Sequence, residues 1–214
     1  MTNKSKPNYH RETLLHKQGF DIIAGVDEVG RGPLAGPVTA AAVVINRSNM
    51  PDGLDDSKRL STKNREALFS QIMESSLVGI AHASVEEIDK INILQASLLA
   101  MKRAFSMLKS QPDYALIDGN TIPDSLAFPA TAIVKGDRKS VSIAAASIVA
   151  KISRDRIMTE LSRLNPGYGW ENNSGYPTKE HLIALRDIGV TPHHRRSFRP
   201  VHNILYKKYS ALNK

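Results

Sequence analysis

Short runs of apolar residues along the chain predict five β-strands, a pattern typical of a folded sheet. The runs cover residues 22–26, 38–45, 77–83, 114–117 and 130–134. Residues 27–37 separate the first two runs, and most of them form the Gly- and Pro-rich segment GRGPLAG. Because a connection this short favours a direct return of the chain, we expect these two strands to be antiparallel neighbours.

Helical periodicity appears between and after the strands. Ser61 can cap a helix that ends near Ser75, with Leu68 and Ile72 on its inner face, and the spacing of Ser84 and Glu87 fits a capping box. A continuous apolar stripe at i, i+4, i+7, i+11 and i+14 predicts a longer helix through Leu94, Leu98, Met101, Phe105 and Leu108.

The C-terminal third is predicted to be mainly helical. Residues 140–156 form a helix in this prediction, with one apolar face made by Val141, Ala145, Ile148 and Ile152 and an opposite polar face made by Ser147, Lys151 and Arg154. A Gly-, Asn- and Pro-rich loop follows at 165–177, then a helix near 178–188 and a basic tail. The order of elements predicts a mixed α/β layered fold, partly antiparallel and partly parallel.

Charge and composition narrow the function classes. The chain has 214 residues, which suits one domain. Its formal net charge of +8 fits a polyanionic partner about as well as it fits a generically basic protein. It has no cysteine, which excludes disulfides, zinc–thiolate sites and cysteine nucleophiles and fits a cytoplasmic protein. The first twenty residues contain no apolar signal-peptide core, and no window is apolar enough for a membrane span, so no membrane association is expected.

Acidic residues follow three of the apolar runs. Asp27 and Glu28 follow the first, Asp118 follows the fourth, and Asp137 comes after the fifth. Each has an ordinary structural explanation: strand ends are often polar, Asp before Gly-Asn is common turn chemistry, and an acid at a helix N-terminus complements the helix dipole.

Together, however, the acids predict a metal site. Hard cations such as Mg²⁺ and Mn²⁺ prefer carboxylate oxygens, and two such ions can activate a water and stabilise the leaving oxygen in phosphodiester cleavage. One geometric condition applies, since adjacent strand residues point to opposite faces. For Asp27 and Glu28 to share a site, the strand is expected to end or bulge between them, which the nearby Gly30 favours.

Seven sequence blocks, in this order, resemble bacterial ribonuclease HII, the type 2 ribonucleases H. They are GVDEVGRGPLAGPV, DDSKRLS, NILQASLLAM, IDGN, KGDRKSVSIAAASIVAKISRDR, GYPTKEH and HHRRSF, spanning residues 25–198. The resemblance implies a ribonuclease H-like mixed sheet flanked by helices. It also implies a single catalytic domain over residues 1–214, with residues 160–214 as a C-terminal helical and basic extension.

The same resemblance implies the activity and its residues. A member of this family hydrolyses the RNA strand of RNA–DNA hybrids and nicks duplex DNA on the 5′ side of single embedded ribonucleotides, leaving 5′-phosphate and 3′-hydroxyl ends. The implied partners are therefore RNA–DNA hybrid and ribonucleotide-containing duplex DNA, the implied cofactor is Mn²⁺ or Mg²⁺, and a monomer is expected. The catalytic and metal-binding residues carried over are Asp27, Glu28, Asp118 and Asp137.

The implied substrate-binding residues lie in two blocks. The backbone of Gly30-Arg31-Gly32 is expected to sense the ribose 2′-hydroxyl, because glycine allows close approach and this hydroxyl separates RNA from DNA. Tyr176 is the candidate to pack on the sugar beside the scissile junction. Without the resemblance, these residues would be a plain tight turn and a surface aromatic residue, and the glycine spacing does not fit a dinucleotide-binding fingerprint.

Other polar residues leave alternatives open. Lys58 is a candidate phosphate contact or simply a solvated lysine, and Lys151 and Arg154 face either nucleic acid or water. The basic run from His193 to Arg196 suggests phosphate contact or plain structure more than a metal site. No nucleophile elbow surrounds Ser142 or Ser147, and no phosphate-binding P-loop is present, so a serine hydrolase and an NTPase are not expected.

Two rival functions remain at this stage. A proofreading exonuclease or a Holliday-junction resolvase would also use a carboxylate cluster, although the Gly-Arg-Gly turn beside Asp27 and Glu28 argues against both. A catalytically silent module that binds RNA–DNA hybrids would not need the acids.

Overall fold

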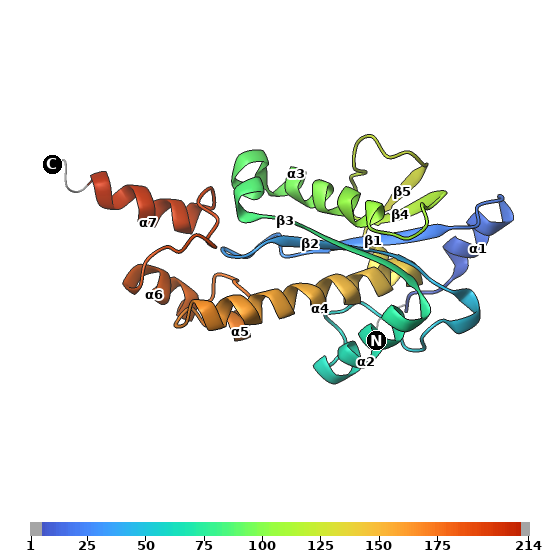
Figure 1. Ribbon diagram of the computed structural model, residues 1–214, viewed down its shortest axis with the longest axis horizontal. Coiled ribbons are helices and arrows are strands. Elements are labelled where there is room, and N and C mark those ends of the chain that lie inside the picture. The colour runs from blue at the N-terminus through green and yellow to red at the C-terminus, as the bar shows by residue number, and fades with distance from the viewer. Residues whose placement is uncertain (1–5, 211–214) are drawn as a thin grey trace, which may run out of the picture. The chain divides into compact units, whose positions relative to one another are not determined.

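A computed structural model describes residues 6–210, whose helices and strands are labelled in Figure 1. The strands are β1 (Ile23–Val29), β2 (Val38–Val44), β3 (Leu77–Ala83), β4 (Tyr114–Asp118) and β5 (Ala130–Ile133). The α-helices are α1 (His10–Lys17), α2 (Thr62–Ser75), α3 (Val85–Ser106), α4 (Val141–Leu164), α5 (Trp170–Asn173), α6 (Lys179–Asp187) and α7 (Arg199–Ser210). A short 3-10 turn, η2 (Gly136–Arg138), precedes α4, and another, η1, covers Arg47–Asn49.

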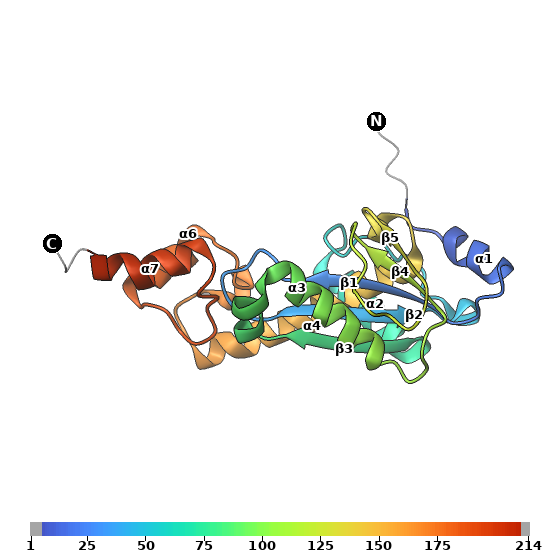
Figure 2. The ribbon, with the colours of Figure 1, turned by 90° about the horizontal axis from the view of Figure 1, so that it is seen from above.

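The five strands form one mixed sheet, in the order β3-β2-β1-β4-β5 (Figure 2). β1 pairs with β2 in antiparallel orientation, and β1 with β4 and β4 with β5 in parallel. The predicted mixed α/β fold and the antiparallel pairing of the first two strands are therefore confirmed. β1 continues three residues beyond its predicted end, because its ladder with β2 extends to Val29.

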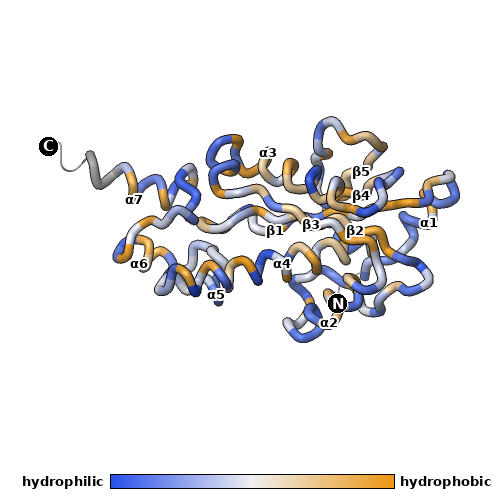
Figure 3. Tube along the Cα trace, in the orientation of Figure 1, coloured by the Kyte–Doolittle hydropathy of each residue, from blue (hydrophilic) through white to orange (hydrophobic). Residues whose placement is uncertain are grey.

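Helices cover both faces of the sheet (Figure 1). α4 lies so close to β1 that a Cβ atom at Gly25 would be 2.2 Å from the backbone carbon of Ser142. α3 lies as close to β3, where a Cβ atom at Gly79 would be 2.1 Å from the carbonyl oxygen of Ala104. Hydrophobic residues recur along the strands (Figure 3), as expected for a sheet that is buried on both faces.

The predicted apolar face of α4 is confirmed, but its polar face is not solvent-exposed. The four apolar residues of that face are buried: Val141, Ala145, Ile148 and Ile152. Ser147 and Arg154, predicted on the opposite face, are also buried, whereas Lys151 is half-buried. Sequence periodicity misses this because it records only which face is apolar, and α4 is enclosed by other segments as well as by the sheet.

The long helix α3 contains a break that the sequence pattern did not reveal. Asn92 has φ 67° and ψ 165°, outside the helical region, and its side-chain oxygen accepts hydrogen bonds from the backbone N–H groups of Leu94 and Gln95. Asn92 therefore caps a second helical segment. The predicted apolar stripe is wrong at Leu94, which is exposed, and correct for Met101, Phe105 and Leu108, which are buried.

Local capping signals were more reliable. The Ser61 side chain accepts a hydrogen bond from the backbone N–H of Asn64 at the start of α2. The Ser84 and Glu87 side chains each accept a hydrogen bond from the other residue's backbone N–H, which confirms the capping box. The predicted loop at 165–177 contains the short helix α5, and helix α7 occupies the predicted basic tail.

The described residues divide into two compact units. The first contains residues 6–29, 39–82 and 97–153, and its core joins the sheet to α2 and the first half of α4. The second contains residues 30–38, 83–96 and 154–210, with apolar clusters around Trp170 and around Leu185. No helix in the described part of the chain is both long enough and apolar enough to cross a membrane. The single catalytic domain with an extension from residue 160 stays a prediction.

The close approach of α4 to β1 can be tested with Gly25→Ala. The added methyl group would overlap backbone atoms of Ser142 and Ile143, so we expect the free energy of unfolding to fall by about 2–4 kcal/mol, measured by urea denaturation. Gly53→Ala is the matched control, because Gly53 has φ +84° but no atom within 4 Å of the added Cβ, and only about 1 kcal/mol of backbone strain is expected. Equal costs at the two positions would contradict the packing explanation.

Candidate active site

Two acids lie at the same level of neighbouring parallel strands. The last paired residues of β1 and β4 are Val26 and Ile117, and the next residues along the two strands are Asp27 and Asp118. Because parallel strands run in the same direction, their carboxyl ends meet at one edge of the sheet. The register of β1 and β4 therefore brings these two carboxylates together from positions far apart in the sequence.

Glu28 completes a cluster with these two residues. One carboxylate oxygen from each of Asp27, Glu28 and Asp118 lies within 4.8 Å of the other two. The expectation that β1 ends or bulges between Asp27 and Glu28 is wrong, since both pair with β2 in regular register. On its other side β1 has already left β4, and there the Asp27 carboxylate accepts a hydrogen bond of 2.7 Å from the Glu28 backbone N–H.

The Asp27 side chain is buried, and its environment disfavours the charged form. Burial raises the pKa of Asp27 well above its ordinary value, and the charges of Glu28 and Asp118 raise it further. Hydrogen bonds from Ser147 and from the Glu28 backbone oppose this effect. Ser147 in turn shares a 2.9 Å hydrogen bond with Ser57, so a chain of two hydroxyl groups orients the Asp27 carboxylate.

Sequence reasoning did not assign Ser57 or Ser147 to the site. Ser147 was considered only as a hydrolase nucleophile, for which it lacks the sequence context. The available signal was its place on the polar face of an otherwise apolar helix, in the block that also supplies Asp137.

A tight turn after β5 places Asp137 near Asp118. The Asp118 carboxylate accepts a hydrogen bond of 2.6 Å from the Gly136 backbone N–H. A Cβ atom at Gly136 would lie 2.5 Å from Ile143 Cδ1 and 3.2 Å from the Asp118 carboxylate oxygen, so glycine allows the close approach. Asp137 is not part of the three-residue cluster. Burial raises its pKa, and the charges of Asp56 and Asp118 raise it further.

Lys58 lies in the loop that supplies Ser57. Its backbone N–H donates to the buried carboxylate of Asp56, which also accepts two hydrogen bonds from Arg138, of 2.9 and 3.1 Å. Burial alone would raise the pKa of Asp56, but these donors hold it below its ordinary value. The Lys58 side chain is exposed, and its charge lowers the pKa of Asp137. The predicted phosphate contact through Lys58 stays a prediction.

The chemistry of the acidic cluster fits divalent cations. All its ligand atoms are carboxylate oxygens, which Mg²⁺ and Mn²⁺ prefer to nitrogen or sulfur. A bound cation would also reduce the repulsion among the acids and lower the pKa of Asp27. Asp27, Glu28 and Asp118 could therefore hold an ion directly, and Asp137 stands near enough to contribute.

The Gly-Arg-Gly loop and Tyr176 lie together in the second unit. A Cβ atom at Gly32 would be 3.3 Å from Tyr176 Cε1, so this glycine admits the ring. Leu34 N–H donates to the Gly175 carbonyl oxygen at 2.7 Å, which ties the two segments together. Arg31, Gly32 and Tyr176 are exposed, whereas Gly30 is buried. The structure thus places the predicted substrate-binding residues of this unit side by side.

Two buried histidines, His181 and His194, form a hydrogen-bonded pair that holds the backbone of Tyr176. The Thr191 backbone N–H donates to His194 Nδ1, so the ring proton of His194 lies on Nε2, which donates to His181 Nε2 at 3.1 Å. Trp170 Nε1 donates to the same nitrogen, so His181 carries its proton on Nδ1 and donates it to the Tyr176 carbonyl oxygen at 2.9 Å. Both rings are therefore neutral, with fixed tautomers.

The basic run from residue 193 to 196 thus contributes mainly structure. His194 and Arg195 are fully buried, whereas Arg196 is exposed. Of the two readings left open by the sequence, plain structure applies to the two buried residues. Arg154, predicted to face nucleic acid or water, faces neither, because its side chain is also buried.

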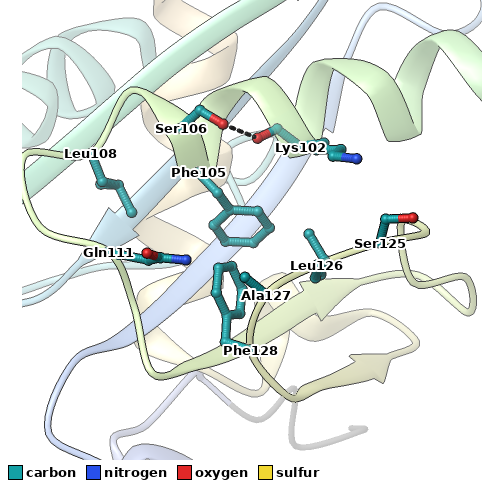
Figure 4. A pocket seen from close by; sticks show the side chains of 9 residues that line it. All are labelled: Lys102, Phe105, Ser106, Leu108, Gln111, Ser125, Leu126, Ala127 and Phe128. Atoms are coloured by element: carbon teal, nitrogen blue, oxygen red, sulfur yellow. Dashed lines mark hydrogen bonds between the residues drawn. The ribbon is translucent and has the colours of Figure 1, made fainter.

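A hollow of about 300 Å³ between α3 and the 125–128 loop is separate from the acidic cluster. Figure 4 shows the rings of Phe105 and Phe128 inside it, meeting edge to face at a centroid distance of 5.2 Å. None of its lining residues is acidic and none is a predicted site residue. This hollow therefore offers no ligands for a divalent cation.

The fold resembles a solved ribonuclease. The crystal structure of ribonuclease H2 from Pyrococcus horikoshii OT3 matches with a TM-score of 0.73 and 27% sequence identity, over 87% of this chain and 98% of that one. The mixed sheet and its acidic cluster define a nuclease of the ribonuclease H class, and the chain is a ribonuclease H enzyme.

Sequence comparisons narrow this class to one family. The family model of ribonuclease HII matches residues 24–201, so the chain belongs to the ribonuclease HII family. A ribonuclease HII from Ruegeria sp. (strain TM1040) is 61% identical over 202 residues, covering 94% of this chain and 88% of its own. One from Cereibacter sphaeroides (strain ATCC 17025 / ATH 2.4.3) is 59% identical over 205 residues, covering 96% and 97%. Membership in this family excludes the resolvase and exonuclease alternatives, and the assignment as a ribonuclease H enzyme leaves the silent module without support.

Asp27→Asn is expected to stabilise the metal-free protein. A carboxyl group whose pKa is raised on folding destabilises the folded state increasingly as pH rises from its ordinary pKa through the raised value, and the uncharged amide removes that cost. At pH 7.5 with EDTA, we expect calorimetry to show a higher melting temperature, by about 2–4 °C for each kcal/mol removed. The exposed Asp52→Asn is the control and should change nothing. A lower melting temperature for Asp27→Asn would contradict the inference that the charged Asp27 carboxylate destabilises the folded metal-free protein.

The histidine pair predicts a loss of stability in acid. Burial and the neighbouring His181 lower the pKa of His194 from 6.5 to about 3. The unfolded chain therefore binds a proton that the folded chain rejects, and stability falls as pH decreases from about 6.5 towards about 3. We expect His194→Asn to reduce this loss by about 1–3 kcal/mol, measured by urea denaturation between pH 7 and pH 4.5. The exposed His10→Asn is the control and should show the wild-type dependence of the free energy of unfolding on pH. The same dependence in His194→Asn would contradict the inference that His194 is buried in its neutral form.

Proposed function

We propose that this enzyme hydrolyses the RNA strand of RNA–DNA hybrids and nicks duplex DNA on the 5′ side of single embedded ribonucleotides, leaving 5′-phosphate and 3′-hydroxyl ends. The observation that carries the proposal is the cluster of three carboxylates within 4.8 Å, where the parallel pairing of β1 with β4 ends, in a member of the ribonuclease HII family. The net charge of +8 supports a polyanionic substrate.

Asp27, Glu28, Asp118 and Asp137 are the proposed catalytic residues, holding Mn²⁺ or Mg²⁺. Such ions, when bound, supply Lewis-acid stabilisation of phosphate charge and activate the attacking water. Ser147 and the Glu28 backbone N–H keep the Asp27 carboxylate in place, and the Gly136 N–H does the same for Asp118. Asp137, which lies outside the three-residue cluster, is proposed to complete the site once substrate is present.

The second unit supplies the proposed recognition of the ribonucleotide. The Gly30-Arg31-Gly32 backbone would approach the sugar and its 2′-hydroxyl, which only RNA offers, and Tyr176 would pack on the same sugar. Their support is the adjacency of Gly32 and the Tyr176 ring. The Lys58 side chain is exposed, and its charge lowers the pKa of Asp137. We propose that Lys58 contacts a backbone phosphate of the substrate. We further propose that the enzyme is a monomer located in the cytoplasm. Its chain is proposed to form one catalytic domain.

The experiment that tests this function uses an end-labelled DNA duplex carrying one ribonucleotide, beside an all-DNA duplex and an RNA–DNA hybrid. We expect a metal-dependent nick 5′ to the ribonucleotide and cleavage of the hybrid's RNA strand, both abolished by EDTA, with the all-DNA duplex intact. Cutting of the all-DNA duplex at an equal rate would refute the proposed substrate class.

Asp118→Asn tests the site within the same assay. Loss of a ligand that contributes several kcal/mol should lower kcat by at least about 100-fold, while affinity for the ribonucleotide duplex stays within about threefold of wild type. The exposed Asp124→Asn serves as the matched control and should cleave normally. Near-normal turnover by Asp118→Asn would remove this residue from the site.

A further inference from the structure

Two arginine side chains are buried in the second unit, where a charge is costly unless it is well compensated. Arg154 is 1% exposed and Arg195 is fully buried. The Arg154 guanidinium donates to three backbone carbonyl oxygens, those of Pro37 at 2.9 Å, Ser174 at 2.9 Å and Ala35 at 3.0 Å. Arg154 therefore joins the end of the Gly-Arg-Gly loop to the segment that precedes Tyr176.

Arg195 holds the same loop at Gly30 and Arg31 and again at Gly36. Its guanidinium donates to the carbonyl oxygens of Gly30 at 2.6 Å, Arg31 at 3.0 Å and Gly36 at 3.0 Å. Its own backbone N–H donates to the carbonyl oxygen of Leu34 at 2.8 Å. The guanidinium also stacks over the Phe198 ring, 5.1 Å from its centroid. A planar fork with five N–H donors suits this task, and a lysine ammonium does not reproduce it.

These contacts fix the direction of the loop's amide groups. In a planar trans peptide, the carbonyl oxygen and the N–H of the next residue point to opposite sides. None of the described residues has a cis peptide bond. Because the carbonyl oxygens of Gly30 and Arg31 point at the buried guanidinium of Arg195, the N–H groups of Arg31 and Gly32 point away from it. They are thus aimed out of the unit's interior, on residues that are themselves exposed.

Gly30 must be glycine for this arrangement. Its φ is +96°, which favours glycine, and a Cβ atom would lie 2.1 Å from Arg154 Nε. The two guanidinium groups also lie near each other: burial, and after it the charge of Arg154, lower the pKa of Arg195 to about 9. Burial lowers the pKa of Arg154 to about 10. Both side chains are charged at neutral pH, so two positive charges stand behind the loop, a field that favours an anion such as a phosphate in front of it.

We propose that Arg195, supported by Arg154, is a positioning residue for ribonucleotide recognition. It holds the loop so that the N–H groups of Arg31 and Gly32 face the ribose and its adjoining phosphate. The inference rests on the proposed function, because it assigns these amides to the ribonucleotide of that substrate. The competing explanation is that both arginines only stabilise the second unit, which predicts lower stability with unchanged discrimination between ribonucleotide and deoxyribonucleotide.

Arg195→Lys and Arg154→Lys distinguish the two explanations, with Arg163→Lys as control. Arg163 lies on the same helix as Arg154, but its side chain is 72% exposed. Binding is measured with Ca²⁺ in place of the catalytic ion, for a duplex with one ribonucleotide and for the all-DNA duplex, and kcat and KM are measured with Mn²⁺. We expect kcat/KM on the ribonucleotide duplex to fall by at least about tenfold in Arg195→Lys, and by less in Arg154→Lys.

The decisive reading is the ratio of the two dissociation constants. The dissociation constant of the all-DNA duplex divided by that of the ribonucleotide duplex should fall towards one in Arg195→Lys. Affinity for the all-DNA duplex and for Mn²⁺ alone should stay within about twofold, because the metal-binding acids belong to the other unit. A folded Arg195→Lys that keeps both the wild-type ratio and the wild-type kcat/KM would overturn the proposal. If the wild-type enzyme itself does not cut the ribonucleotide duplex, the proposed function fails first, and the inference with it.

A measurement on the wild-type protein covers the case in which Arg195→Lys does not fold. In ¹⁵N-resolved NMR with Ca²⁺, the amide signals of Arg31 and Gly32 should shift more on addition of the ribonucleotide duplex than of the all-DNA duplex. The Gly53 amide, which belongs to the first unit, is the internal control and should respond equally to both. Equal responses of the Arg31 and Gly32 amides to the two duplexes would overturn the proposal.

Discussion

Crowding of negative charge where the pairing of two parallel strands ends is the constraint on which the site depends. The register that pairs Val26 with Ile117 leaves Asp27 and Asp118 at the same level, and Glu28 joins them within 4.8 Å. Like charges at this separation oppose folding unless they are protonated, hydrogen-bonded or bound to a cation. The surrounding residues supply N–H and hydroxyl donors, but these do not offset burial and the charges of Glu28 and Asp118, since the pKa of Asp27 stays raised. The remaining imbalance favours a divalent ion.

The sequence predicted those parts of the fold that depend on local patterns. Five apolar runs became five strands, and the caps at Ser61 and Ser84 formed as expected, because both signals involve residues close together in the chain. The break at Asn92 was missed, although asparagine is a common N-cap, because the apolar periodicity on both sides of it is nearly continuous. Leu94 is exposed for the same reason, since the helix restarts beside it.

For the acidic cluster, the sequence predicted the acids but not the residues that support them. Asp27 and Asp118 could be found because each follows an apolar run, and parallel pairing then places both at one sheet edge. Their supporting residues could not be found in this way. Ser147 and Arg195 are polar residues whose burial depends on segments distant in sequence, and a polar residue in a helix or a basic run is ordinarily solvent-exposed. Their roles follow from tertiary contacts, to which local periodicity is blind.

The acids of the cluster and the buried arginines share one feature, which is anchoring to the backbone. The carboxylates of Asp27 and Asp118 accept hydrogen bonds from backbone N–H groups, and the guanidinium of Arg195 donates to backbone carbonyl oxygens. Backbone groups in strands and tight turns lose little further freedom when they bind a side chain, so such anchors fix position at a lower entropic cost than flexible ion pairs do. They also leave the net charge of each group unneutralised. The carboxylates therefore remain available to cations, and the guanidinium field remains available to a phosphate, which are the two kinds of charge that a phosphodiester-cleaving enzyme has to bind.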